Sequence, residues 1–120
     1  MAWNVEHTDE FADWYHGLIE VQQDDVTAAG LLLMEMGPQL PFPYSSGIKG
    51  SKHAHMRELR VQSGGRPLRV FYAFDPRRSA ILLIGGDKSG TKRFYETMIP
   101  VADRPYDEYI EELRNEGLLP

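Results

Sequence analysis

The sequence predicts an α+β fold in which a mainly antiparallel sheet packs against helices that precede and follow it. Apolar residues recur at helical spacing in the N-terminal third, they alternate with polar residues from Met56 onward, and helical spacing returns after Thr91. Strands that are grouped together between helices are typical of α+β proteins, because alternating βαβ units would separate them. The predicted order of elements is therefore β-α-α-β-β-β-α-α.

The N-terminal third is predicted to contain a short strand over residues 3–6 and two helices. Thr8 is a favourable N-cap for the first helix, which has acidic residues in its first turn. An apolar face runs along this helix and is formed by Phe11, Trp14, Tyr15, Leu18 and Ile19. The second helix is expected over residues 24–36, where Gly37 followed by proline ends it, and residues 41–47 are expected to form a loop.

Three antiparallel strands are predicted next, over residues 56–62, 67–74 and 80–86. Gly64 and Gly65 suit a two-residue primed turn between the first two strands, because both positions of that turn need a positive φ. This turn places Arg60 directly opposite Arg69.

The second hairpin is expected to have residues 76–79 as its loop and to pair Asp75 with Ala80, which places Gly86 opposite Arg69. Because side chains alternate along a strand, one face then carries charged residues toward one end and apolar residues toward the other: Glu58, Arg60, Arg69, Lys88, Phe71, Ala73, Leu82 and Ile84. The opposite face is nearly all apolar and is expected to form the core against the helices: Leu59, Val61, Leu68, Val70, Tyr72, Phe74, Ile81 and Leu83.

Two helices are predicted after the sheet. Thr91 is a suitable cap for the first, which reaches Met98, and Pro100 and Pro105 separate it from the second. The second helix shows helical spacing in Tyr106, Tyr109, Ile110 and Leu113. No internal repeat or linker divides the chain, so residues 1–120 are expected to form one domain.

The composition argues against several classes of protein. The chain has no cysteine, which excludes a disulfide framework and thiolate metal sites and favours a cytoplasmic protein. The longest apolar runs, such as residues 80–84, are too short to cross a bilayer, and the acidic N-terminal region lacks the basic start of a signal peptide. We therefore expect no membrane association.

Charge is distributed very unevenly along the chain, although the net charge is only −5. Residues 1–44 contain eight acidic residues and no Lys or Arg, and residues 45–93 contain three acidic residues and eleven Lys or Arg. Residues 94–120 contain seven acidic residues and two Lys or Arg. A middle segment this basic can bind a polyanion, because local potential steers a ligand more than net charge does. The alternative is that basic and acidic segments neutralise each other in the fold.

The facing arginines are the most informative local feature. Like charges directly opposite each other on a sheet are unfavourable, so Arg60 and Arg69 need an anion between them. A phosphate would serve, and so would Glu58 within a purely structural network. We expect Arg69 to be a surface cation whose removal leaves the fold intact.

Cleavage of RNA without a metal uses the 2′-hydroxyl of the substrate as nucleophile, so the protein supplies a proton acceptor, a proton donor and cations for the developing phosphorane charge. The basic residues of the predicted sheet suit the cationic role: Arg60, Arg69 and Lys88. The nearby groups that can transfer protons are His53, His55 and Tyr95. Lys49 and Lys52, in the same loop as the histidines, could hold the RNA backbone.

The same segments suggest two other chemistries. His53 and His55 share a spacing that suits metal ligands, but no third ligand follows at a recognisable distance, so we expect no metal site. The glycine-rich residues 85–90 depart from the GxxxxGK[ST] pattern and lack a surrounding βαβ unit, which argues against nucleotide hydrolysis. No cofactor is expected.

Four segments, taken in order, resemble the HigB-like, phage-derived toxins of the RelE/ParE toxin–antitoxin superfamily. They are His55-Met56-Arg57-Glu58-Leu59-Arg60, then residues 69–78, then Gly85-Gly86-Asp87-Lys88, and finally Phe94-Tyr95 with Ile99-Pro100 and Ala102-Asp103. No single motif is diagnostic, but their order and spacing across residues 49–113 are typical of the family. The resemblance implies a RelE-like α+β fold.

The resemblance also implies a function, which is that of an mRNA endoribonuclease that arrests translation, often at the ribosomal A site. Such a toxin is neutralised by a cognate antitoxin, usually a helix-turn-helix protein, in a hetero-oligomer. The catalytic residues implied are Arg60 and Arg69 as phosphate-holding arginines, Lys88, Tyr95 and His53. The residues expected to bind RNA are Lys49, Lys52, His55, Arg57, Lys92 and Arg93.

Two alternatives share this sequence pattern. One is a ParE-like toxin that inhibits DNA gyrase without cleaving RNA, for which the acidic helices would suit protein binding. The other is a phage accessory domain that binds nucleic acid or a host protein and is not toxic.

Overall fold

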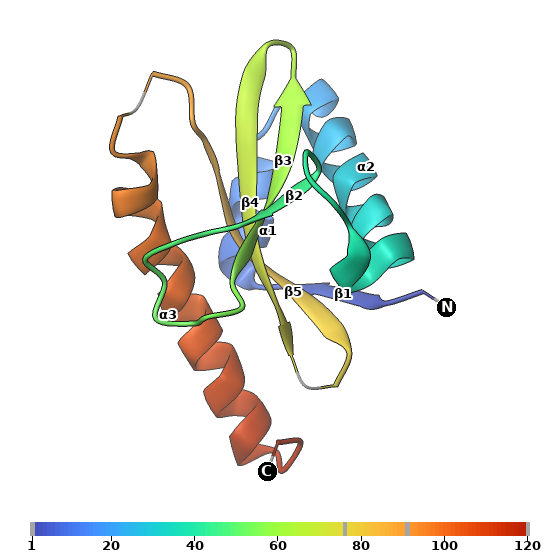
Figure 1. Cartoon of the computed structure of the whole chain (residues 1–120), viewed down its shortest axis with the longest axis vertical. Coiled ribbons are helices and arrows are strands. Elements are labelled where there is room, and N and C mark those ends of the chain that lie inside the picture. Colours follow the sequence, from blue (N-terminus) through green and yellow to red (C-terminus); the bar gives the residue numbers. More distant parts are fainter. Residues whose placement is uncertain (1, 76, 91, 120) are drawn as a thin grey trace.

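The computed structural model describes residues 2–75, 77–90 and 92–119. It contains, in chain order, β1 (Asn4–His7), α1 (Asp9–His16), α2 (Glu20–Met36), the short 3₁₀ helix η1 (Gly37–Gln39), β2 (Ser45–Gly47), β3 (Arg57–Ser63), β4 (Arg66–Asp75), β5 (Ser79–Asp87) and α3 (Phe94–Asn115) (Figure 1). Helices precede and follow one group of strands, so the predicted α+β class is confirmed.

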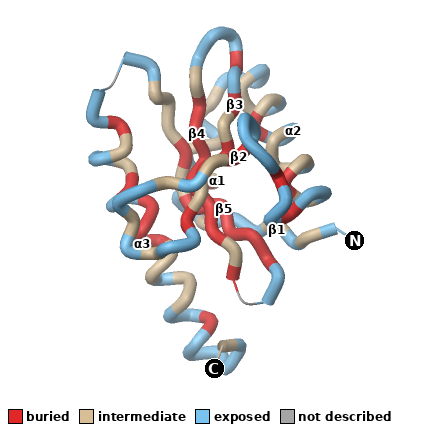
Figure 2. The backbone as a smooth tube through the Cα atoms, in the orientation of Figure 1, coloured by how far each residue is buried: buried red, intermediate tan, exposed pale blue. Residues whose placement is uncertain are grey.

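The strands form one sheet in the order β1-β5-β4-β3-β2. β1 runs parallel to β5, and the remaining neighbours are antiparallel. Apolar side chains of α1 and α2 pack on one face of the sheet, and those of α3 pack on the other (Figure 1). The buried residues therefore concentrate along the central strands β4 and β5 (Figure 2).

The register of the first hairpin is confirmed. Gly64 and Gly65 have φ of 57° and 82°, as a primed turn requires, and Arg60 pairs with Arg69. A side chain at either glycine would be strained at that φ, which is why this turn holds the register so firmly.

The second hairpin was predicted correctly at one end only. Gly86 pairs with Arg69, but a β-bulge between Phe71 and Tyr72 leaves Leu83 without a partner, so Asp75 pairs with Ser79 rather than Ala80. A shift of one residue reverses the facing of the side chains beyond the bulge. Ile81 and Leu83 therefore pack against α3 and Leu82 packs against α1 and α2, opposite to the prediction.

Several predicted boundaries were also wrong. The apolar face of α1 was extended too far, because the helix ends at His16 and leaves Ile19 exposed. α2 begins at Glu20 rather than residue 24, and the expected loop over residues 41–47 contains the short strand β2.

The C-terminal segment forms one helix rather than two. α3 runs through Pro100 and Pro105, although each proline removes one backbone hydrogen bond from the helix. Burial of Ile99 and Leu113 compensates for these losses. Thr91, the expected cap, lies outside the described residues, and α3 begins at Phe94.

Within the described ranges 2–75, 77–90 and 92–119, none of the helices is both long enough and apolar enough to span a membrane.

Candidate functional site

A cluster of polar side chains lies on the α3 side of the sheet, where β3, β4, the end of β5 and the first turn of α3 meet. We call it the arginine–tyrosine cluster, and it consists of Glu58, Arg60, Arg69, Lys88 and Tyr95. The paired positions of Arg60 and Arg69 follow from the hairpin turn, and Glu58 lies two residues before Arg60 on the same face.

Gly86 explains how α3 approaches this cluster. It lies opposite Arg69, and a Cβ atom built on it would be only 3.0 Å from the ring of Phe94. The missing side chain therefore lets the first turn of α3 lie against β5, which brings Tyr95 over the strands.

Glu58 is the anion that lies between the two arginines. Its side chain is only 4% exposed. Oε2 is 3.3 Å from Nη1 of Arg60, and Oε1 is 3.6 Å from Nε of Arg69. The hydroxyl of Tyr95 donates a hydrogen bond of 2.7 Å to the same Oε1. One buried carboxylate thus contacts three of the other members of the cluster.

The cluster has a buried layer and a more exposed layer. Arg69 belongs to the buried layer, because its side chain is 6% exposed and Nη1 donates to the backbone oxygen of Leu68. The expectation that Arg69 is a surface cation is therefore wrong, since the first turn of α3 covers it. Among the described residues, no hydrogen-bond acceptor reaches Nε of Arg69. Arg60, Lys88 and Tyr95 are only partly buried and form the accessible layer.

Tyr95 is a proton donor in this environment. Burial raises the pKa of its hydroxyl, the hydrogen bond to Glu58 raises it further, and Arg69 opposes both effects in part. The phenol therefore stays protonated at neutral pH. The ammonium group of Lys88 lies 5.3 Å from the centre of the Tyr95 ring, close enough for a cation–π contact.

His53, the remaining catalytic candidate, lies in a different place. Its Nε2 is 2.7 Å from Oδ1 of Asp107, and its ring packs edge-on against Tyr106. Asp107 follows Tyr95 by twelve residues of α3, which corresponds to about 18 Å of helix rise. The structure therefore brings together four of the five predicted catalytic residues and holds His53 beside the middle of α3, away from Tyr95.

The residues expected to bind RNA are divided between the segment just before α3 and the loop that contacts the middle of this helix. Lys49, His55, Lys92 and Arg93 are exposed, whereas Arg57 is half-buried and donates from Nε to Ser45. Lys52 is exposed and pairs with Asp107, and this hydrogen bond lowers the pKa of the Asp107 carboxyl and raises that of the lysine.

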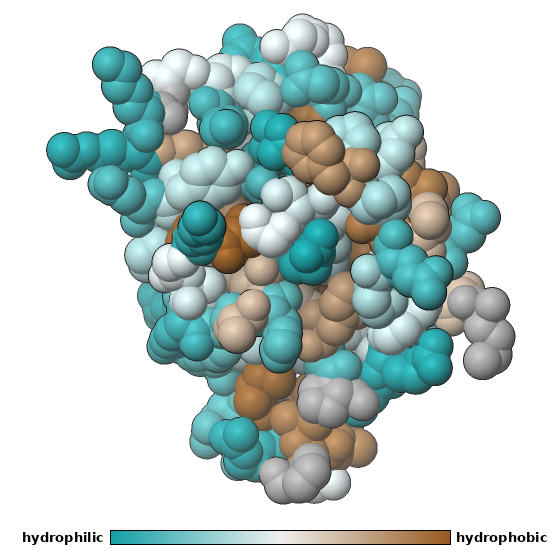
Figure 3. All heavy atoms as spheres, in the orientation of Figure 1, coloured by the Kyte–Doolittle hydropathy of each residue, from teal (hydrophilic) through white to brown (hydrophobic). Residues whose placement is uncertain are grey.

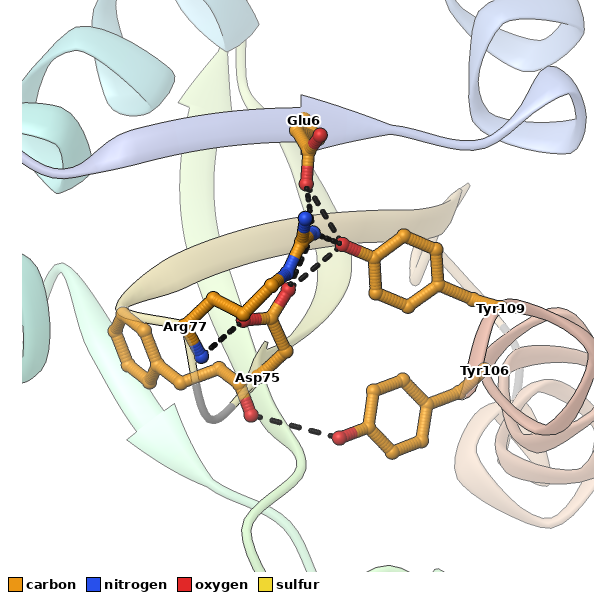
Figure 4. Close-up of polar contacts among 6 residues, drawn as sticks. Glu6, Asp75, Arg77, Tyr106 and Tyr109 are labelled. Atoms are coloured by element: carbon orange, nitrogen blue, oxygen red, sulfur yellow. Dashed lines mark hydrogen bonds and ion pairs between the residues drawn. The ribbon is translucent and has the colours of Figure 1, made fainter. Parts of the chain in front are cut away.

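A second polar network was missed by sequence reasoning, and it joins β1, the end of β4 and α3 (Figure 4). The hydroxyl oxygen of Tyr109 lies 2.7 Å from Oε2 of Glu6 and 2.7 Å from Oδ2 of Asp75, and Nη2 of Arg77 lies 3.1 Å from both carboxylates. Burial alone would raise the pKa of Asp75, but hydrogen bonds from Tyr109 and Arg77 bring it below its usual range. This network fastens α3 to the sheet, and no local pattern predicts it, because its members come from segments far apart in the chain.

Within the described parts of the chain, no group of three or more His, Asp or Glu side chains is arranged to hold a metal ion. The arginine–tyrosine cluster itself combines partly exposed cations, a protonated phenol and a buried carboxylate.

Comparison with known proteins places this chain in a family. Residues 13–107 match the family described as "Phage derived protein Gp49-like". The chain is 40% identical over 98 residues to the candidate toxin HigB3 of Mycobacterium tuberculosis. The aligned residues make up 81% of this chain and 84% of HigB3. It is 34% identical over 117 residues to the candidate toxin HigB2 of the same organism, covering 96% of this chain but only 58% of the length of HigB2.

Two solved structures share the fold at low sequence identity. The isolated RelE toxin of Escherichia coli matches with a TM-score of 0.60 at 11% identity, covering 83% of this chain and 99% of RelE. A chain of the RelBE2 toxin–antitoxin complex of M. tuberculosis matches with a TM-score of 0.56 at 16% identity. This match covers 73% of the present chain and 100% of the chain in the complex. These likenesses confirm a RelE-like fold. Together with the matching family and relatives, they identify the chain as a member of the Gp49-like, phage-derived family of HigB-like proteins within the RelE superfamily.

Proposed function

We propose that this protein is the toxin of a toxin–antitoxin pair and that it arrests translation by cleaving mRNA without a metal. Two relatives that bear the names of toxins support the first part. The second part rests on one observation, which is that Arg60, Lys88 and Tyr95 form an accessible layer over the buried pair Glu58–Arg69.

In the proposed reaction the scissile phosphate binds to the accessible layer. The 2′-hydroxyl of the substrate attacks the adjacent phosphorus, the bond to the 5′ oxygen breaks, and a cyclic phosphate forms. Arg60 and Lys88 stabilise the charge that develops on the phosphorane oxygens. Tyr95 protonates the departing 5′ oxygen, because its hydroxyl carries a proton at neutral pH.

Glu58 has two roles in this proposal. Before substrate binds, it holds Arg60 and Tyr95 in place through the contacts described above. Once the phosphate has replaced it as the partner of Arg60, the carboxylate accepts the proton of the 2′-hydroxyl. His53 has no part in the proton transfers, because its contacts with Tyr106 and Asp107 hold it away from Tyr95.

The proposal includes the setting in which the protein acts. We infer a cytoplasmic toxin that acts on mRNA at the ribosome and is neutralised by a helix-turn-helix antitoxin in a hetero-oligomer. The solved RelBE2 complex supports an antitoxin partner, because a chain of that toxin–antitoxin complex shares this fold. The exposed basic residues near the arginine–tyrosine cluster, Lys92 and Arg93, are suited to contacts with the RNA backbone.

The test is to induce the protein in a bacterium and to map new 5′ ends on cellular RNA, and to repeat the cleavage with purified protein, RNA and EDTA. Lys88→Ala should abolish the new ends. Arg104→Ala is the matched control, because Arg104 is an exposed cation on α3 that pairs only with Glu108 among the described residues. Growth arrest without new RNA ends would point to gyrase or another protein target, and retained cleavage by Lys88→Ala would refute the assignment of the site.

A further inference from the structure

A groove opens between α2 and the outer edge of β3, beside the arginine–tyrosine cluster. β2 pairs with residues 57–59 of β3 only, so the edge beyond Arg60 is not covered by another strand. The groove has a volume of about 550 Å³, which is the size of a small-molecule site. Its lining includes Asp25, Ala29, Leu40, Tyr44, Arg60 and Gln62.

The lining of this α2–β3 groove combines apolar walls with polar groups that have no partner. Alanine and leucine side chains of α2 and the loop after η1 form the walls. Within the described residues, neither Asp25 nor Gln62 forms a side-chain hydrogen bond or an ion pair. Flat apolar surfaces with a few free hydrogen-bonding groups suit an aromatic heterocycle.

Two exposed aromatic side chains lie by the groove: Tyr44 belongs to its lining, and the ring of Phe42 lies against Arg60 of that lining. Phe42 is 69% exposed and Tyr44 is 52% exposed, although large apolar side chains are usually at least half-buried. Hydrophobic residues lie among hydrophilic ones over the face of the molecule that Figure 3 shows. Exposed aromatic rings next to cations are typical of proteins that bind single-stranded nucleic acid, because every base can stack on them.

Arg60 connects the groove to the arginine–tyrosine cluster. Its guanidinium carbon lies 5.1 Å from the centre of the Phe42 ring, and its Nη1 lies 3.3 Å from Glu58. A phosphate bound to Arg60 is therefore within one nucleotide of the groove. Arg69, the buried cation of the cluster, also contributes to the floor of the groove.

We propose that the α2–β3 groove binds the nucleobase next to the scissile phosphate. Phe42 stacks on that base, and the carboxylate of Asp25 accepts a hydrogen bond from its exocyclic amino group. Adenine, cytosine and guanine carry such a group, whereas uracil does not, so the groove discriminates against uracil. This inference rests on the proposed function of the cluster and adds the residues that select the sequence to be cut.

The test measures binding of fluorescently labelled six-nucleotide RNAs in which every ribose is 2′-O-methylated, so that none can be cleaved. One oligonucleotide is made for each of the four bases. Phe42→Ala should weaken binding of the three amino-bearing oligomers about 5- to 150-fold, the range measured when a stacked aromatic ring is removed. Asp25→Asn should reduce their advantage over oligouridine. Leu31→Ala, a control on the exposed surface of α2, should bind as the wild type does.

Three results would overturn the inference, and two of them leave the proposed function intact. If Phe42→Ala and Asp25→Asn bind like the wild type while Lys88→Ala binds weakly, the cluster holds RNA but the groove does not. If Lys88→Ala also binds normally, the proposed function fails as well. If Phe42→Ala weakens binding of the purified antitoxin and leaves RNA binding unchanged, the groove is a protein-docking surface. Phe42 is too exposed for its truncation to unfold the protein, and thermal unfolding of each variant checks this.

Discussion

Removing the hydroxyl of Tyr95 separates its chemical role from its packing role. Tyr95→Phe keeps the ring, and with it the contacts to Lys88, Phe71 and Phe94. It deletes a 2.7 Å hydrogen bond to the buried carboxylate of Glu58. A hydrogen bond to a charged group contributes about 1.5–3 kcal/mol, so the free energy of unfolding should fall by about that amount. The rate of RNA cleavage should fall roughly 10²- to 10⁴-fold, because the proton donor is lost.

Tyr109→Phe is the matched control for this experiment. Its hydroxyl also lies 2.7 Å from a buried carboxylate, that of Asp75, in the network that includes Glu6 and Arg77. Urea unfolding should therefore show a similar loss of stability for both variants. Single-turnover cleavage, measured well below either unfolding midpoint, should fall for Tyr95→Phe only. Equal cleavage rates for the two variants would refute the assignment of Tyr95 as proton donor.

Three further predictions concern stability. Arg69→Ala should cost about 3–5 kcal/mol in urea unfolding, because it leaves the buried carboxylate of Glu58 without its nearest buried cation, and an unchanged midpoint would contradict the buried pairing. Asp75 has a lowered pKa in the folded protein. Its ionised form therefore stabilises the fold at pH values above the pKa of about 3.9 that the carboxyl has in the unfolded chain. This contribution to stability disappears as the pH falls through the lower pKa of the folded protein. Asp75→Asn should therefore flatten the acid-induced loss of stability below about pH 4, and an unchanged acid profile would show that the carboxylate gains nothing from Tyr109 and Arg77. Gly37→Ala should lower the melting temperature, because φ at this position is 57° and the new Cβ would lie 2.3 Å from the indole nitrogen of Trp3. A melting temperature equal to that of the wild type would mean that Trp3 can move aside freely.

The sequence was sufficient for those parts of the site that depend on local geometry. Gly64 and Gly65 determine a turn type, the turn determines a register, and the register places Arg60 opposite Arg69. The anion between them was narrowed to two candidates, and the structure contains Glu58 at that position. Tyr95 was expected to be functional because of its place near the basic strands, and it does contact them.

Other features could not be predicted because they depend on contacts between distant segments. Turn chemistry does not reveal the bulge after Phe71, since an extra residue in one strand is accommodated by packing on both faces of the sheet. Pro100 and Pro105 indicate a helix break, but burial against the sheet keeps α3 continuous. The position of His53 depends on Asp107, which lies 54 residues further along the chain. The pairing of β1 with β5, and with it the network around Tyr109, likewise arises only when segments far apart in the chain meet.

The buried carboxylate of Glu58 has a consequence for how an RNA would bind. Each phosphate that a Lys or Arg neutralises releases counterions condensed on the nucleic acid, and that release makes the affinity for nucleic acid fall as salt rises. The single carboxylate of Glu58 already cancels one of the two charges of Arg60 and Arg69 from within the protein. A phosphate that docks therefore replaces the Glu58 carboxylate as the partner of Arg60. The number of cations in the site then overstates the number of counterions that are released. Affinity for RNA should depend on ionic strength less steeply than the basic middle segment suggests, and discrimination should depend more on shape and stacking than on charge.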